Sequence, residues 1–144
     1  MRRLLARYRE SLPLVPGAVK AVEGLAARWP LGLASSSNRE VIDTVLELAG
    51  IAQYFRATVS SEEVERGKPA PDVYLEAARR LGVDPTDCAA VEDSANGIRS
   101  ARAAGMRVIA IPNPHYPPSD DVLALADVTL HSLDELTPER VSAS

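Results

Sequence analysis

Two adjacent carboxylates, Glu92 and Asp93, lie between a short apolar run and the expected start of a helix. The run 88–91 is typical of a buried strand in a parallel sheet, and Ser94 can cap the helix that follows. Ligands bind at the carboxyl ends of strands in open α/β sheets. Neighbouring carboxylates repel each other unless a proton or a cation neutralises them, and Mg²⁺ suits two carboxylates and a substrate phosphate. The pair predicts a magnesium site, although a solvated loop at a helix N-terminus would show the same acids.

Other polar residues are expected at the same edge of the sheet. A serine-rich loop begins at Ser35, directly after the apolar run 31–34, and Lys68 precedes a helix that leads back to the sheet. A hydroxyl group and a helix N-terminus donate to phosphate oxygens, and an ammonium group offsets negative charge. Each feature alone is commoner as a turn or a solvated loop. Their occurrence together predicts a phosphoryl group bound with its metal.

Apolar periodicity predicts helices and strands that alternate along the chain. We expect strands at 31–34, 57–59, 88–91, 107–111 and 128–130, and helices at 1–12, 18–28, 39–49, 71–81, from 95 to the Gly105 stop, and near 119–125. Alternation of this kind produces a parallel sheet with right-handed crossovers. The predicted fold class is therefore α/β, with a three-layer, Rossmann-like arrangement.

Composition limits the classes of partner. The 144 residues suffice for one domain with a core, and the net charge of −4 argues against nucleic acid. No apolar run has membrane-spanning length, and the first residues lack the apolar core of a signal peptide. The single cysteine, Cys88, cannot form an internal disulfide. We therefore expect a cytoplasmic protein that binds neither nucleic acid nor membrane.

Three segments together resemble a known family. Residues 34–38, residues 68–72, and residues 91–94 with Gly97 are similar to motifs two, three and four of the haloacid-dehalogenase-like (HAD) hydrolases. Within that superfamily they resemble the beta-phosphoglucomutase and sugar-phosphate phosphatase branch. The resemblance extends from about residue 13 onward and implies a HAD-like core domain over 13–144.

The resemblance also implies roles for individual residues. Ser35 and Lys68 would be catalytic: Ser35 would bind the transferring phosphoryl group, and Lys68 would pair with the phosphate and the nucleophilic aspartate. Mg²⁺ would be held by Glu92 and Asp93. Further contacts to substrate or phosphate would come from Ser37, Asn38 and Arg39. The implied activity is magnesium-dependent phosphoryl transfer, as a phosphatase or phosphomutase, on a small phosphorylated metabolite, with a sugar phosphate favoured.

The family's first motif has no counterpart in these 144 residues. That Asp-x-Asp motif ends the central first strand and supplies the nucleophile that becomes an aspartyl-phosphate. Most of the helical cap is also missing, and residues 1–12 resemble a remnant of its last helix. We therefore expect an incomplete core and an inactive isolated chain. The alternative is a truncated, non-catalytic module that binds phosphate or metal or assembles with another chain.

A missing central strand has a structural consequence. It would leave a gap of about 10 Å between strands 31–34 and 88–91, with costly unpaired backbone groups. We expect these strands to pair directly, or to be completed by a homo-oligomer or a complementing chain. Residues 1–12 look unsuited to the gap because their apolar spacing is helical. A receiver domain of two-component signalling is disfavoured, because its lysine should follow the acidic residues and Lys68 precedes them.

Overall fold

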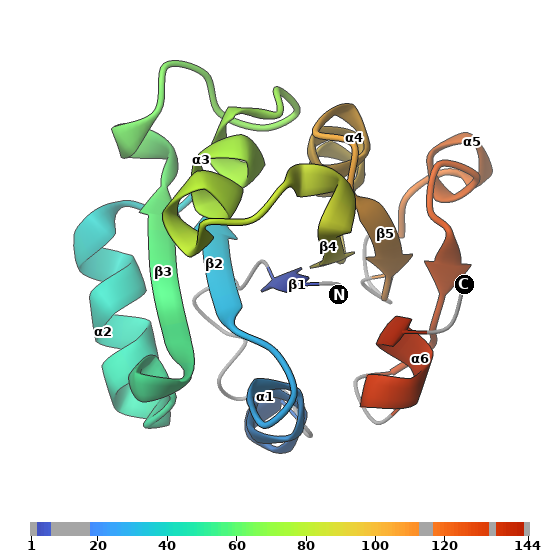
Figure 1. The fold of residues 1–144 in the computed structure, drawn as a ribbon. Helices are drawn as coiled ribbons and strands as arrows, with labels where there is room; N and C mark the ends of the chain where they lie inside the picture. The colour runs from blue at the N-terminus through green and yellow to red at the C-terminus, as the bar shows by residue number, and fades with distance from the viewer. Residues whose placement is uncertain (1–2, 7–17, 113–116, 133–134, 143–144) are drawn as a thin grey trace.

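The computed structural model describes residues 3–6, 18–112, 117–132 and 135–142. Helices and strands alternate along the chain (Figure 1). The strands are β1 (Arg3–Ala6), β2 (Leu31–Ser35), β3 (Phe55–Ser60), β4 (Cys88–Glu92), β5 (Arg107–Ala110) and β6 (Val128–Thr129). The α-helices are α1 (Ala18–Ala26), α2 (Arg39–Ala49), α3 (Asp72–Leu81), α4 (Ala95–Ala103), α5 (Asp120–Leu123) and α6 (Pro138–Ser142). Short 3-10 turns are η2 (Ala52–Tyr54), η3 (Ser61–Glu63) and η4 (Pro85–Asp87).

All six strands belong to one parallel sheet. Their order is β3-β2-β1-β4-β5-β6, so that β1 lies at the centre with β2 on one side and β4 on the other. Leu4 is paired with Leu31 of β2 and with Ala89 of β4. Every pairing in the sheet is parallel, and the carboxyl ends of the strands therefore meet at one edge.

The position of β1 corrects two of our expectations. Residues 3–6 form a strand, and the expected helix over 1–12 is wrong for them; residues 7–12 lie outside the described part of the chain. The strands β2 and β4 do not pair with each other, because β1 occupies the position between them. The sheet is continuous without a second chain, which removes the structural reason for a complementing chain.

Helices cover both faces of the sheet. Helices α1, α2 and α6 pack on one face with Leu31 and Leu33 of β2. The other face packs against α3, α4 and α5. Neighbouring residues of β4 point to opposite faces, since Ala89 joins the first cluster and Ala90 the second. The predicted three-layer α/β fold is confirmed (Figure 1).

Polar capping residues lie at the starts of two helices, and a glycine ends one of them. Asn38 and Ser94 accept hydrogen bonds from the backbone N–H groups of Val41 and Gly97 at the starts of α2 and α4. Gly50 ends α2 with a φ of 70°, a left-handed conformation that glycine adopts without strain. Helix α6 follows the last expected element, the strand 128–130, and was not expected. None of the described helices is long and apolar enough to cross a membrane.

Removal of β1 should destabilise the fold strongly. Deletion of residues 1–6 would leave the facing edges of β2 and β4 without backbone partners. We expect the free energy of unfolding to fall by at least about 3 kcal/mol, because each buried unpaired group costs about 1–3 kcal/mol. Urea denaturation followed by circular dichroism measures this. Deletion of residues 1–2 alone is the control, and equal stability of the two deletions would contradict the assignment of β1.

Candidate functional site

Lys68 connects the carboxyl ends of two strands. Its Nζ donates to the carbonyl oxygen of Ala34 in β2, at 3.2 Å, and to Oε2 of Glu92 at the end of β4, at 2.6 Å. The side chains of Lys68 and Glu92 are only 2% and 0% exposed. A buried charge pair of this kind is tolerated because each member neutralises the other. The structure therefore brings together the end of β2, Lys68 and Glu92, as the sequence predicted.

Tyr74 and Gly97 complete the surroundings of Glu92. The hydroxyl group of Tyr74, on α3, donates to the same Oε2 atom at 2.5 Å, and Lys68 Nζ lies 4.9 Å from the centre of the Tyr74 ring. A Cβ atom on Gly97 would lie 1.9 Å from Oε1 of Glu92. Glycine at this position of α4 is what allows the carboxylate to turn into the protein interior.

One carboxylate oxygen at this edge lacks a donor. Oε1 of Glu92 is buried and has no hydrogen-bond partner among the described residues, which is costly for a carboxylate unless another group compensates it. Asp93, the next residue, is half-buried. A hard cation such as Mg²⁺ accepts oxygen ligands of this type and keeps several waters. These residues therefore fit Mg²⁺, although the described residues contain no cluster of three or more metal-ligating side chains.

Hydrogen bonds from the last residue of β3 and from the turn after it hold the serine-rich loop. Ser35 is 1% exposed, and its Oγ accepts from the backbone N–H of Ser37 at 3.0 Å. Ser60 Oγ donates to the carbonyl oxygen of Ser37 at 2.7 Å, and Ser61 Oγ donates to that of Ser36 at 3.1 Å. The loop that we expect to contact phosphate is thus fixed by two neighbouring hydroxyl groups.

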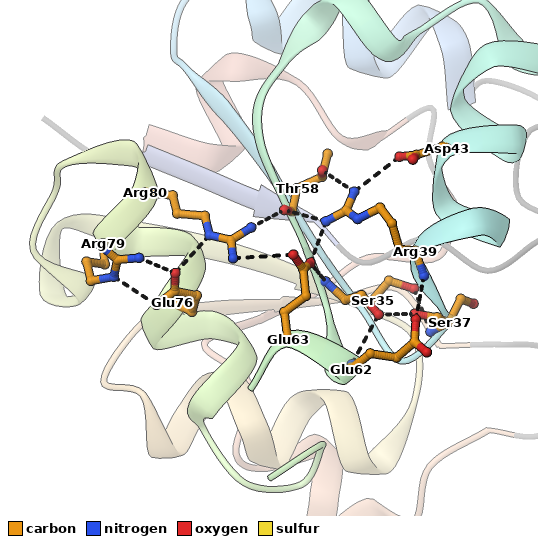
Figure 2. A network of polar contacts seen from close by, with 11 residues as sticks. Ser35, Ser37, Arg39, Asp43, Thr58, Glu62, Glu63, Glu76, Arg79 and Arg80 are labelled. Atoms are coloured by element: carbon orange, nitrogen blue, oxygen red, sulfur yellow. Dashed lines mark hydrogen bonds and ion pairs between the residues drawn. The ribbon is translucent and has the colours of Figure 1, made fainter. Parts of the chain in front are cut away.

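The side chains of Asn38 and Arg39 have structural partners. Asn38 caps α2 through its Oδ1 atom. The Arg39 guanidinium donates to the side chain and carbonyl oxygen of Thr58, and to Asp43 and Glu63, while its backbone N–H donates to Glu62 (Figure 2). Figure 2 shows Arg39 directed toward β3 and η3. Their roles as substrate contacts remain predictions, and what the structure shows is that both residues fix the start of α2.

Glu63 joins three elements through one carboxylate. Its Oε1 accepts from the Ser60 N–H at 2.8 Å and from Arg39 at 2.5 Å, and its Oε2 lies 3.5 Å from Arg80 of α3 (Figure 2). The hydrogen bond from the Ser60 backbone, together with Arg39, lowers the pKa of Glu63. Arg79 and Arg80 similarly lower the pKa of Glu76 to about 2. The network holds η3 between α2 and α3.

Sequence reasoning missed several residues of this region. Tyr74 lies in the expected helix 71–81 and is buried; a buried tyrosine hydroxyl needs a partner, and that need was the available signal. Glu62 and Glu63 lie outside the expected helices and strands. Ser60 and Glu63 have the spacing of a capping box, and that spacing was the available signal for Glu63. The contacts of both acids with Arg39 lie at separations of 23 and 24 residues, which no local pattern records.

Loss of the Tyr74 hydroxyl group should destabilise the protein. Tyr74→Phe would leave the buried Glu92 carboxylate with one donor fewer, which should lower the free energy of unfolding by about 1–3 kcal/mol. Urea denaturation measures the change. Tyr54→Phe is the matched control, because that half-buried residue has no hydrogen bond through its hydroxyl group in the described part of the chain. Equal stability of the two variants would contradict the buried hydrogen bond.

Glu63→Gln should remove a pH-dependent contribution to stability. Because the pKa of Glu63 is lower in the folded chain, its contribution is present above the unfolded pKa of about 4.3 and is lost as the pH falls through the folded value. The wild type should be more stable at neutral pH by less than about 1 kcal/mol, since the pairs are partly exposed. The difference should shrink in acid. Urea midpoints across the pH range test this, with the exposed Glu65→Gln as control, and a constant difference would refute it.

Comparison with known proteins relates the chain to a family, to a curated protein and to solved structures. The family model for haloacid dehalogenase-like hydrolases matches residues 2–105. Hexitol phosphatase B of Escherichia coli K12 is 42% identical over 136 residues, which cover 94% of this chain and 61% of that protein. A crystal structure of CbbY from Rhodobacter sphaeroides in complex with phosphate is similar with a TM-score of 0.80 and 29% identity, covering 90% of this chain and 59% of the other.

Beta-phosphoglucomutase from Clostridium difficile is also similar in structure, with a TM-score of 0.74 and 26% identity over 88% of this chain and 54% of the other. The chain thus spans 61% of the length of the curated hexitol phosphatase that it matches. The family match covers most of the chain, and the solved structures share its sheet and helices. On these grounds the chain belongs to the haloacid dehalogenase-like hydrolases, in the branch that includes beta-phosphoglucomutase and the hexitol phosphatases.

Proposed function

We propose that this chain is the phosphate-binding and metal-binding part of a phosphatase or phosphomutase that acts on a small phosphorylated metabolite. The observation that carries the proposal is the contact of one buried lysine, Lys68, with the ends of β2 and β4. This contact places a serine-rich loop, an ammonium group and two carboxylates at one edge of the sheet. A phosphoryl group needs donors and neutralising charge of this kind.

Each residue would have a separate role in binding. Ser35 and the backbone N–H groups of its loop would donate to phosphate oxygens. The hydrogen bonds from Ser60 and Ser61 keep this loop in place. Lys68 would offset the phosphate charge from its fixed position between the strands. Asp93, with Oε1 of Glu92, would hold Mg²⁺, which would neutralise charge on the phosphate when it is bound.

The covalent step needs a group that these 144 residues do not contain. In our proposal the phosphoryl group passes to an aspartate of an Asp-x-Asp segment, and no such segment occurs in this sequence. The names of similar proteins, hexitol phosphatase B and fructose-1-phosphate phosphatase, favour a sugar or sugar-alcohol phosphate as the substrate. The second candidate is a non-catalytic binding module, favoured by the occupation of the sheet centre by β1.

Titration with Mg²⁺ and inorganic phosphate tests the proposed site. Only two protein carboxylates would hold the metal, and we therefore expect dissociation constants on the order of 1 mM, with amide shifts confined to residues 35–38 and 92–94. Asp93→Asn should weaken Mg²⁺ binding, and Ser35→Ala should weaken phosphate binding. The exposed Asp87→Asn and Ser132→Ala are the controls. Mg²⁺ binding that survives Glu92→Gln combined with Asp93→Asn would place the metal elsewhere.

The same preparation distinguishes binding from turnover. With Mg²⁺ present, hydrolysis of p-nitrophenyl phosphate, fructose 1-phosphate and hexitol phosphates should proceed at the rate of buffer alone, because the chain has no acceptor aspartate. A rate above that of buffer, abolished by Asp93→Asn, would show that the chain contains its own nucleophile and would contradict this proposal.

A further inference from the structure

A pocket lies at the edge of the sheet opposite to the candidate site. Strands β2 and β3 begin there, directly after Pro30 and Tyr54, and the candidate site lies where β2 ends. Five residues of β2 rise by roughly 13 Å between these two edges. In Figure 1 the starts of β2 and β3 lie at the bottom, near α1. A pocket of about 400 Å³ is lined there by the end of α1, the turn after it, and the segment that enters β3.

The lining combines two arginines with two aromatic rings. Arg28 and Arg56 contribute guanidinium groups, and Trp29 and Tyr54 contribute the rings. Gln53 adds an amide, and small apolar residues complete the wall. None of the described lining residues is acidic. The pocket is therefore positively charged, in a chain whose net charge is −4.

The two arginines differ from most other described arginines in lacking a carboxylate partner. Within the described residues, no carboxylate lies within ion-pair distance of Arg28 or Arg56. Ion pairs are made by Arg39, Arg66, Arg79, Arg80 and Arg102. An arginine just past a helix C-terminus is favourable for the helix, which accounts for Arg28 after α1. That reason does not apply to Arg56, which lies in β3.

Trp29 fixes the position of one guanidinium. The Arg28 guanidinium carbon lies 5.3 Å from the centre of the Trp29 ring, an arrangement that attracts the cation to the ring face. A guanidinium that packs through its face keeps the N–H groups on its edge available for an anion. Trp29 is itself 6% exposed and therefore rigidly held in the core. The contact with Trp29 favours one position of the exposed Arg28 side chain, which lowers the entropic cost of binding.

We propose that this pocket binds a phosphate monoester that also carries an aromatic ring system, of the size and chemistry of a nucleoside monophosphate. Guanidinium groups bind phosphate through paired N–H···O bonds, and Arg28 and Arg56 would bind the phosphate together. The flat organic part would lie against Tyr54 and the small apolar residues of the wall, with Gln53 donating to its polar atoms. A volume of about 400 Å³ lies within the range of small-molecule sites, roughly 300–1,000 Å³.

The experiment uses the fluorescence of Trp29, the only tryptophan in the chain. Addition of AMP should change its emission in a saturable way, with a dissociation constant below about 1 mM. Three partial ligands should each bind at least about tenfold more weakly than AMP. Adenosine lacks the phosphate, and ribose 5-phosphate and inorganic phosphate lack the flat base. No saturation by AMP, or equal affinity for inorganic phosphate, would overturn the proposal.

Variants locate the binding. Arg56→Ala should raise the dissociation constant for AMP about tenfold, by removal of one charged donor, while leaving Trp29 and Arg28 in place. Arg99→Ala is the matched control, because Arg99 is exposed on α4 and has no carboxylate partner among the described residues. Ser35→Ala, at the other edge of the sheet, should leave AMP affinity unchanged. If Ser35→Ala raised the dissociation constant for AMP as much as Arg56→Ala does, AMP would not bind in this pocket and the proposal would be refuted. This outcome is independent of whether the proposed function is correct.

Discussion

The buried carboxylate of Glu92 imposes requirements on four other parts of the chain. A charge removed from water costs several kcal/mol unless it is paired and hydrogen-bonded. Lys68 must therefore reach into the interior, which requires the loop before α3 to fold back over the ends of β2 and β4. Helix α3 must present Tyr74 to the same oxygen, and α4 must approach with Gly97, since any side chain there would collide with Glu92. One ion pair thus fixes the relative positions of both strands and both helices at the candidate site.

The partly exposed network around Glu63 contributes in a different way. Its ion pairs involve side chains that are about one-third exposed, and pairs of this kind are individually weak and are screened by salt. The more rigid part of this region consists of the hydrogen bonds from Ser60 and Ser61 to the backbone of the serine-rich loop. The charges then orient η3, while the hydroxyl groups fix the loop. The geometry of the serine-rich loop therefore depends on the hydroxyl groups more than on the charges.

Much of the fold and part of the site were predictable from local sequence. Short continuous apolar runs located β2, β4 and β5, and the capping residues Asn38 and Ser94 located the starts of α2 and α4. The strand β1 was not predictable, because Leu4 and Leu5 have helical spacing with later residues and the backbone partners that make them a strand lie far away in the sequence. Tertiary pairing overrode the local pattern.

Separation along the sequence also limits the prediction of polar contacts. A motif placed Lys68 near Glu92, since both belong to segments whose strands end at one edge. No pattern indicated which acid would accept from Arg39, because the choice depends on how closely α2 approaches η3. The motifs therefore predicted the groups that face one edge, and the structure was needed for the hydrogen bonds that hold them.

The central position of β1 has a consequence for synthesis of the chain. A ribosome releases Arg3 well before Cys88, its partner in β4, which emerges only after three further helices and two further strands have been made. During that interval β1 can pair with β2 alone, and its other edge remains open to strands of other molecules. Sheets that depend on such distant pairings close slowly. The nascent chain is therefore most exposed to aggregation between the release of β3 and the release of β4, and a chaperone would protect it most in that window.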